Sequence, residues 1–447
     1  MTGRLAAGLT TVAVVAASLA LQGCAGDGPE LPKLSDLNPF KEKVTPLPGR
    51  RVSLVERDGK SPGESVDATV PVTLPPERAN EAWSQPGGEP ANAPGHLALG
   101  GTGLKQVWSS DAGQGSSSKG RLTASPVVAD GRVFTLDADG KVSAFSANGG
   151  SVVWRTELAP EGGTKGNGYG GGLAIDSGRL YGASGYGIVA AIDPATGKKI
   201  WEKSIGAPVR ASPTAAGDRV YVVTSHGRFH AFNGSDGSEV WAVRGLPQSA
   251  SLVNNASPAI SGDMVVVPYP SGDLVALKIG DGSTVWTETL TRSRGTNAQS
   301  SLTDAARPSI DQGTVFGVGH AGRMVAVQLR NGERLWSLNI AGIQAPWVAG
   351  ETVFVVDTAG QLMALARRDG KVQWTTQLPA AKVWTGPTLA GGMLWLASSS
   401  GKLVGVEAVT GRLTATVDIG NPVFVAPVVA QGRMYVLTDN AKLIALN

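Results

Sequence analysis

Thr196-Gly197-Lys198-Lys199-Ile200-Trp201 decides the fold, because its Gly and Trp, four positions apart, recur along the chain. The other copies are Gly150/Trp154, Gly237/Trp241, Gly282/Trp286, Gly332/Trp336 and Gly370/Trp374. Trp108 begins the series, and Gly411 ends it with Ala415 in the place of the Trp. From Trp108 to Ala415 the marks stand 46, 47, 40, 45, 50, 38 and 41 residues apart. A period of about 44 residues predicts a repeat architecture whose units pack on one another.

Each unit has three further landmarks. An X-Pro step such as Ser125-Pro126 opens every unit except the second, which has Gly172-Leu173. An aliphatic–aromatic pair such as Val133-Phe134 follows a short turn, and a Gly-x-aliphatic-x-Ala run such as Gly187 to Ile192 comes next. With the Gly–Trp run, these landmarks make four short β-type segments separated by turn sequences. Four antiparallel strands joined by hairpins form one propeller blade.

The count of the marks predicts eight blades and the way in which the ring closes. The last unit lacks its final run, and Leu104 to Trp108 is an isolated copy of that run near the start of the repeats. Pairing this copy with the C-terminal strands completes blade eight and hides two sheet edges. We therefore expect an all-β, eight-bladed β-propeller over residues 80–447, closed by an N-terminal strand.

The N-terminus reads as a secretion signal over residues 1–23. Arg4 precedes an apolar run from Leu5 to Leu21, which ends in small residues. A membrane-spanning anchor is the alternative, but Gly8 and Thr10 dilute a run that would need about 20 apolar residues. Leu21-Gln22-Gly23-Cys24 resembles a bacterial lipobox, which predicts lipidation of Cys24. Ordinary signal-peptidase cleavage, with Cys24 lost or left free, is the alternative.

Residues 24–79 read as a tether between the lipidated Cys24 and the propeller. Of the 27 prolines in the chain, 12 lie between Pro29 and Pro94. The charges in this stretch are mixed and no amphipathic period persists, so it cannot bury enough apolar surface to fold alone. A short strand around Val66 to Leu74 stays open.

Composition and motifs argue against several classes of function. A net charge of +3 with 17% charged residues is too weak for a nucleic-acid partner. Gly166, Gly168 and Gly171 match a dinucleotide-binding pattern, but no helix follows, so a loop is expected. His226 and His230 would lie about 13 Å apart along a strand, which does not suit a metal. We expect no cofactor, no metal site and no catalytic residues.

The run Thr196 to Trp201 resembles the tryptophan docking motif of pyrroloquinoline-quinone (PQQ) dehydrogenases. A lipobox, a long tether and eight such repeats together resemble the BamB family of outer-membrane β-barrel assembly lipoproteins, in its alphaproteobacterial type. The resemblance implies a non-enzymatic scaffold of the Bam complex. It also implies a lipid anchor in the outer membrane and a position on the periplasmic face.

The resemblance also implies partners. A family member docks on the periplasmic POTRA domains of BamA, with other Bam subunits and unfolded outer-membrane proteins as further partners. One contact loop of the family maps onto residues 247–258, where Leu252 matches, and the other maps onto residues 301–304, where Leu302 and Asp304 match. Packing of these leucines against the propeller is the alternative interpretation.

Two other functions stay open. A PQQ-dependent dehydrogenase of this fold implies a deep funnel, a carboxylate base and a Ca²⁺ site, and many such enzymes carry a vicinal disulfide. The disulfide is impossible here, because Cys24 is the only cysteine. A lipid-anchored envelope sensor or binding module is the other possibility.

Overall fold

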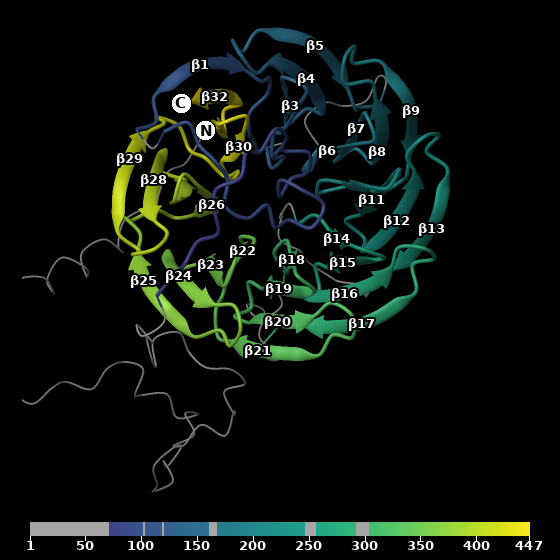
Figure 1. The fold of residues 1–447 in the computed structure, drawn as a ribbon. Helices are drawn as coiled ribbons and strands as arrows, with labels where there is room; N and C mark the ends of the chain where they lie inside the picture. Colours follow the sequence, from purple (N-terminus) through teal and green to yellow (C-terminus); the bar gives the residue numbers. More distant parts are fainter. Residues whose placement is uncertain (1–70, 102, 119, 161–167, 246–255, 292–303) are drawn as a thin grey trace, which may run out of the picture. The chain divides into compact units, whose positions relative to one another are not determined.

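The computed structural model describes residues 71–447 except 102, 119, 161–167, 246–255 and 292–303. The described residues form eight four-stranded antiparallel sheets arranged as a ring, which Figure 1 shows along its axis. The predicted eight-bladed β-propeller is confirmed. Blades 1 to 7 hold β2–β5, β6–β9, β10–β13, β14–β17, β18–β21, β22–β25 and β26–β29, and blade 8 holds β30, β31, β32 and β1.

The two inner positions of each blade are short strands with largely buried side chains. The innermost strands are β2 (Val127–Ala129), β6 (Gly171–Asp176), β10 (Thr214–Ala216), β14 (Ala259–Ser261), β18 (Ser309–Asp311), β22 (Trp347–Ala349), β26 (Trp384–Ala390) and β30 (Val428–Ala430). The second strands are β3 (Arg132–Leu136), β7 (Arg179–Ser184), β11 (Arg219–Val223), β15 (Met264–Pro268), β19 (Thr314–Val318), β23 (Thr352–Val356), β27 (Met393–Ser398) and β31 (Arg433–Leu437).

The third strand of each blade is largely buried, whereas the outer strand lies at the rim and exposes most of its side chains. The third strands are β4 (Lys141–Ser146), β8 (Ile188–Ile192), β12 (Arg228–Asn233), β16 (Asp273–Lys278), β20 (Met324–Gln328), β24 (Gln361–Ala366), β28 (Lys402–Glu407) and β32 (Lys442–Leu446). The outer strands are β5 (Val152–Glu157), β9 (Lys199–Ser204), β13 (Glu239–Arg244), β17 (Thr284–Thr289), β21 (Arg334–Leu338), β25 (Val372–Gln377), β29 (Leu413–Asp418) and β1 (Gln106–Asp111). None of the described residues belongs to a helix long and apolar enough to cross a bilayer.

The recurring tryptophans join neighbouring blades, as the sequence predicts. Trp154 in blade 1 donates its indole N–H to the carbonyl of Pro194 in blade 2, at 3.0 Å. Its ring also covers Gly197, where a Cβ would lie 2.6 Å from the ring atoms. The Gly of each repeat therefore contacts the Trp of the preceding repeat, and not the Trp four positions after it. The Gly of one blade makes room for the Trp of the blade before it. The same bond, at 2.7 to 3.0 Å, joins Trp108 to Ala147, Trp201 to Gly234, Trp241 to Ile279, Trp286 to Leu329, Trp336 to Arg367 and Trp374 to Ala408.

Blade 7 shows how the repeat tolerates the loss of its Trp. In the other blades the outer Trp stands opposite a buried Ala, as Trp201 stands opposite Ala191. In blade 7 Ala415 stands opposite Gly405. The fully buried Trp395, on the second strand, lies against this Gly, where a Cβ would come 3.0 Å from its ring. At this position of the second strand most other blades carry Phe or Tyr, and in blade 7 the larger Trp occupies it.

The ring closes with β1, the first strand of the described residues, as predicted. β1 pairs antiparallel with β32, placing Trp108 opposite Ala445 and Asp111 opposite Lys442. Lys105 and Asn447 extend this pairing with two backbone hydrogen bonds of 2.9 Å. Blade 8 therefore combines the two ends of the propeller sequence in one sheet, and β1 covers the strand edge that β32 would otherwise expose.

Residues 78–98, here called the central strip, contact the inner region of every blade. Backbone hydrogen bonds join Asn80 to blade 8, Trp83 to blade 1, Ser84 to blade 2, Pro90 to blade 4, Ala91 to blade 5 and Leu97 to blade 7. The side chain of Gln85 bonds Ala215 in blade 3, and Trp347 in blade 6 donates to the carbonyl of Gly95. In Figure 1 this purple-blue segment crosses the middle of the ring. It links the blades at their centre, as the tryptophans link them further out.

Candidate functional site at one face of the ring

The strand order defines a connection face, the end of the ring where each outer strand passes to the innermost strand of the next blade. Four antiparallel strands bring the chain back to the face from which it started, so all these connections meet at one end. The longest one joins β17, which ends at Thr289, to β18. The next longest join β1, which ends at Asp111, to β2, and β13, which ends at Arg244, to β14. Long connections on a rigid scaffold are common places for binding.

The predicted partner residues belong to the connections that follow β13 and β17. Leu252 and Leu302 lie outside the described residues, and so does the predicted lipidation site Cys24. Asp304 is described, and only 6% of its surface is exposed. Its Oδ2 has no hydrogen-bond partner among the described residues. Burial raises the pKa of this carboxyl to about 8, although a hydrogen bond from the backbone of Ala305 acts in the opposite direction.

A cavity of about 570 Å³ is lined by the connections of six blades and by the central strip. The strip contributes Trp83, Pro86, Gly87 and Asn92. Asn92 is buried and donates to the carbonyls of Pro258 and Pro308, which holds the strip against blades 4 and 5. The remaining lining residues are Ser116, Arg121, Leu122, Thr123, Ser125, Tyr169, Arg307, Ile343–Trp347, Val383, Gly386–Thr388, Phe424–Ala426 and Asp439.

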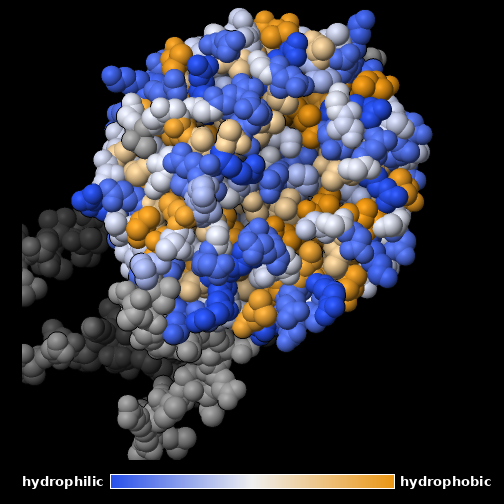
Figure 2. Space-filling view, viewed as in Figure 1, coloured by the Kyte–Doolittle hydropathy of each residue, from blue (hydrophilic) through white to orange (hydrophobic). Residues whose placement is uncertain are grey.

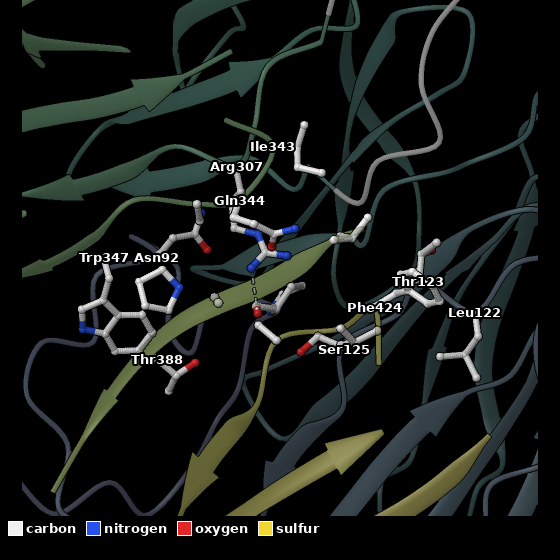
Figure 3. A pocket seen from close by; sticks show the side chains of 18 of the residues that line it. Asn92, Leu122, Thr123, Ser125, Arg307, Ile343, Gln344, Trp347, Thr388 and Phe424 are labelled. Carbon is white, nitrogen blue, oxygen red and sulfur yellow. Dashed lines mark hydrogen bonds between the residues drawn. The ribbon is translucent and has the colours of Figure 1, made fainter. Parts of the chain in front are cut away.

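Arg307 is the polar centre of this cavity. Its Nη1 donates to the carbonyl of Pro86 at 2.9 Å, so the guanidinium is held against the strip (Figure 3). Burial lowers the pKa of Arg307 to about 10, which leaves it charged at neutral pH but poorly hydrated. Arg121 is a second cation in the lining, and Asp439 is the only carboxylate among the described lining residues. The charged groups of the cavity therefore favour an anion.

Apolar side chains make up most of the remaining walls. Trp83 and Trp347 stack with ring centroids 6.3 Å apart. Figure 3 places Trp347 on one side of Arg307 and Phe424 on the other. Trp83 is 2% exposed, and its buried Nε1–H has no hydrogen-bond partner among the described residues. The cavity thus combines aromatic and aliphatic walls with a charged group.

Sequence reasoning did not find this cavity, although one signal was available. At the X-Pro steps the residue before Pro is small in every unit but one, as at Ser125, Ser212 and Ala345. The exception is Arg307, and a long cation at a position that otherwise needs a small side chain marks a special site. The other lining residues come from separate blades and have no common spacing.

The two histidines that the sequence offers as possible metal ligands lie outside this cavity. His226 and His230 line a smaller cavity with Arg228 and Arg244. His230 Nδ1 lies 2.7 Å from a carboxylate oxygen of Glu239. Over the described ranges no group of three or more His, Cys, Asp or Glu side chains is placed to hold a metal ion.

The chain is similar to known proteins in sequence and in fold. A family model described as outer membrane protein assembly factor BamB matches residues 97–165, 138–376 and 374–447. Over 141 residues the chain is 30% identical to the outer membrane protein assembly factor BamB of Shewanella oneidensis, covering 30% of this chain and 35% of that one. The same factor of Burkholderia pseudomallei is 28% identical over 141 residues, with 32% and 34% covered. The aligned stretches thus span about a third of the length of these relatives.

Solved structures show the same architecture. BamB from Moraxella catarrhalis matches with a TM-score of 0.66 and 17% identity, covering 77% of this chain and 99% of that one. A quinohemoprotein alcohol dehydrogenase from Comamonas testosteroni matches with a TM-score of 0.66 and 13% identity, covering 82% and 80%. At these identities the likeness establishes the fold, and the function has to be argued from the site. Because the family model covers most of the propeller, the chain belongs to the family of the outer membrane protein assembly factor BamB.

Proposed function

We propose that this protein is a non-enzymatic scaffold of the outer-membrane β-barrel assembly machinery. It binds the POTRA domains of a BamA-like barrel protein through its connection face and is held at the outer membrane by a lipid on Cys24. The observation that carries the proposal is the family match, which runs through the propeller from residue 97 to the C-terminus. The relatives at about 30% identity bear the name of outer-membrane assembly factors.

The geometry of the ring supports a scaffold. Eight blades joined at the rim and at the centre form a rigid body. Leu252, Leu302 and Asp304 belong to two of the three longest connections of the connection face. Figure 2 shows apolar side chains as separate spots among polar ones, which is ordinary for a protein surface.

The charged groups of the cavity argue against a quinone enzyme. The enzymes of this fold imply a Ca²⁺ site, and Ca²⁺ takes six to eight oxygen ligands, several of them carboxylates. Asp439 alone provides a carboxylate among the described lining residues, and it shares the cavity with Arg121 and Arg307. Cations repel Ca²⁺, so these residues do not fit the metal that such an enzyme needs.

Co-purification with matched variants tests the scaffold. The full-length lipoprotein is extracted from membranes and the amount of BamA-like protein bound to it is measured. Leu252→Asp and Leu302→Asp place a charge where apolar contact is proposed, and each should reduce recovery of the partner at least tenfold. Asp304→Asn removes the carboxylate with little change in volume. Asp304→Arg is unsuitable, because a buried position cannot take an arginine without disturbing the fold.

Val240→Asp is the matched control. Val240 is an exposed aliphatic residue on the outer strand β13, at the rim, and its replacement adds the same charge. It should leave recovery of the partner unchanged. Equal loss in the control, or no recovery of a BamA-like protein by the unmodified chain, would count against the proposal.

A further inference from the structure

We propose that the cavity on the connection face is a binding site for a small amphipathic anion, namely a carboxylate on an apolar body. Its carboxylate pairs with Arg307, and its body lies against Trp347 and Phe424. This is a ligand site in addition to the proposed partner contact, and it does not depend on that contact.

The dimensions of the cavity suit a small molecule. Its volume of about 570 Å³ lies within the range of about 300 to 1,000 Å³ found for small-molecule sites. The central strip closes it on one side with Trp83, Pro86 and Gly87. The strip is fixed to all eight blades, so this wall is preformed and a ligand loses little free energy in ordering it.

The charge of the ligand follows from Arg307. A guanidinium offers its N–H donors in a planar fork that matches a carboxylate, often with two parallel hydrogen bonds. Its contact with Pro86 fixes the orientation of the fork in advance. Arg121 adds attraction for an anion, whereas a cationic ligand would meet two arginines and the single carboxylate of Asp439.

The apolar body of the ligand follows from the walls. Trp347 is 7% exposed and Val425 is 6% exposed, while Phe424 is 40% exposed in the same lining. Exclusion of water by these side chains strengthens the pairing of the guanidinium with an anion. Leu122 and Ile343 extend the apolar surface. A fully hydrated anion such as phosphate would leave this surface unused.

Calorimetry with the full-length chain in nanodiscs tests the proposal. Indole-3-propionate is titrated in parallel with its neutral amide, and empty nanodiscs correct for partition into lipid. A second pair, a short apolar peptide with a free or an amidated C-terminus, distinguishes a small acid from a chain terminus as the source of the carboxylate. In at least one pair the carboxylate should bind at least tenfold more tightly than the amide.

Two substitutions locate the site. Arg307→Met keeps the aliphatic length and removes the charge, so the acid should bind at least tenfold more weakly. Because Arg307 also holds the strip, Gln344→Glu provides an independent variant: it adds a carboxylate to the lining, which repels the acid while Arg307 keeps its place. Arg412→Gln is the control, since Arg412 is an exposed arginine paired with Glu407 at the rim.

The possible results of these titrations either support the ligand site or overturn it. Weaker binding in Gln344→Glu, with an unchanged melting temperature and normal binding in Arg412→Gln, supports the site. Equal affinity for acid and amide in both probe pairs overturns it. So does acid binding that survives both substitutions, or the absence of heat with every probe at millimolar concentration. None of these outcomes depends on a BamA-like partner.

Discussion

Gly197 and Trp154 show at the scale of the residue why each repeat needs both its Gly and its Trp. Gly197 has a φ of 75°, which L-residues with a side chain rarely adopt, and Trp154 fills the space where its Cβ would be. Two separate physical reasons thus require glycine at one position. A pattern with two causes is easily recognised in a sequence, which explains why this spacing predicted the fold.

Gly197→Ala separates the two causes when it is compared with Gly206→Ala. Gly206 has a φ of 70°, but no atom lies within 4 Å of the point that a Cβ would occupy there. Gly206→Ala should cost only the backbone strain, about 1 kcal/mol. Gly197→Ala should cost that amount plus about 1 to 3 kcal/mol for displacing the indole. Urea denaturation measures both, and equal losses would show that the Trp contact contributes nothing.

Asp304 predicts a pH dependence of stability. Its pKa in the folded protein, about 8, lies above the ordinary value of 3.8 for an aspartate, because burial disfavours the charged form. Its contribution to stability is therefore complete below about pH 4 and is lost as the pH rises to about 8. The loss amounts to at most about 1.4 kcal/mol for each pH unit between these two values.

Asp304→Asn removes this titration. The free energy of unfolding of the variant should match that of the unmodified chain near pH 5 or fall slightly below it, and should exceed it at pH 9. Denaturation at pH 5, 7 and 9 measures the difference. Asp418→Asn is the control, because Asp418 is exposed and Lys402 and the backbone of Gly420 lower its pKa. A constant difference between Asp304→Asn and the unmodified chain would contradict the buried, titrating carboxyl.

At the scale of the element, the central strip works as a linker between blades. Gln85 is 1% exposed and bonds two blades at once, through the carbonyls of Ile175 and Ala215 and the amide of Ala215. The sequence placed this segment at the beginning of the propeller but gave no sign of its path. Its contacts lie up to hundreds of residues away and follow no period, so pattern analysis cannot detect them.

Gln85→Ala should lower the free energy of unfolding by about 1 to 3 kcal/mol, because it leaves buried groups of two blades without partners. Hydrogen exchange should report the change locally, with the amide of Ala215 exchanging faster. Gln377→Ala is the matched control, because Gln377 is exposed and bonds only within its own blade. An Ala215 amide that is equally protected in both variants would show that the strip does not support the blades.

At the scale of the whole molecule, the periodic parts of the sequence predicted the ring and its closure, while the cavity was missed. The number of blades follows from the number of repeats. The closure follows from the last repeat, which lacks its final strand sequence, and from the isolated copy of that sequence at Leu104 to Trp108. The cavity has neither signal, since Arg307, Trp347 and Phe424 come from three different blades and meet the strip only in the folded ring. Leu252 and Leu302 stay predictions, because they lie outside the described residues.

Closure by β1 predicts how a shortened chain behaves. A chain beginning at residue 112 lacks β1 and the strip, and it exposes the edge of β32. It should associate through that edge, whereas a chain beginning at residue 104 keeps β1 and should stay monomeric with reduced stability. Light scattering measures the mass of each. A peptide of residues 71–111 added to the shorter chain should restore the monomer, and a monomeric chain without the peptide would contradict closure by β1.

The path of the central strip also sets the order of events in folding. Asn80 donates to the carbonyl of Val429, a partner 349 positions later. The central strip therefore cannot complete its contacts until the final sheet has been made. Contacts over such separations slow folding, because the chain loses much conformational freedom before they form. The contacts of the strip are consequently completed only with the last blade, although its residues precede every blade in the chain.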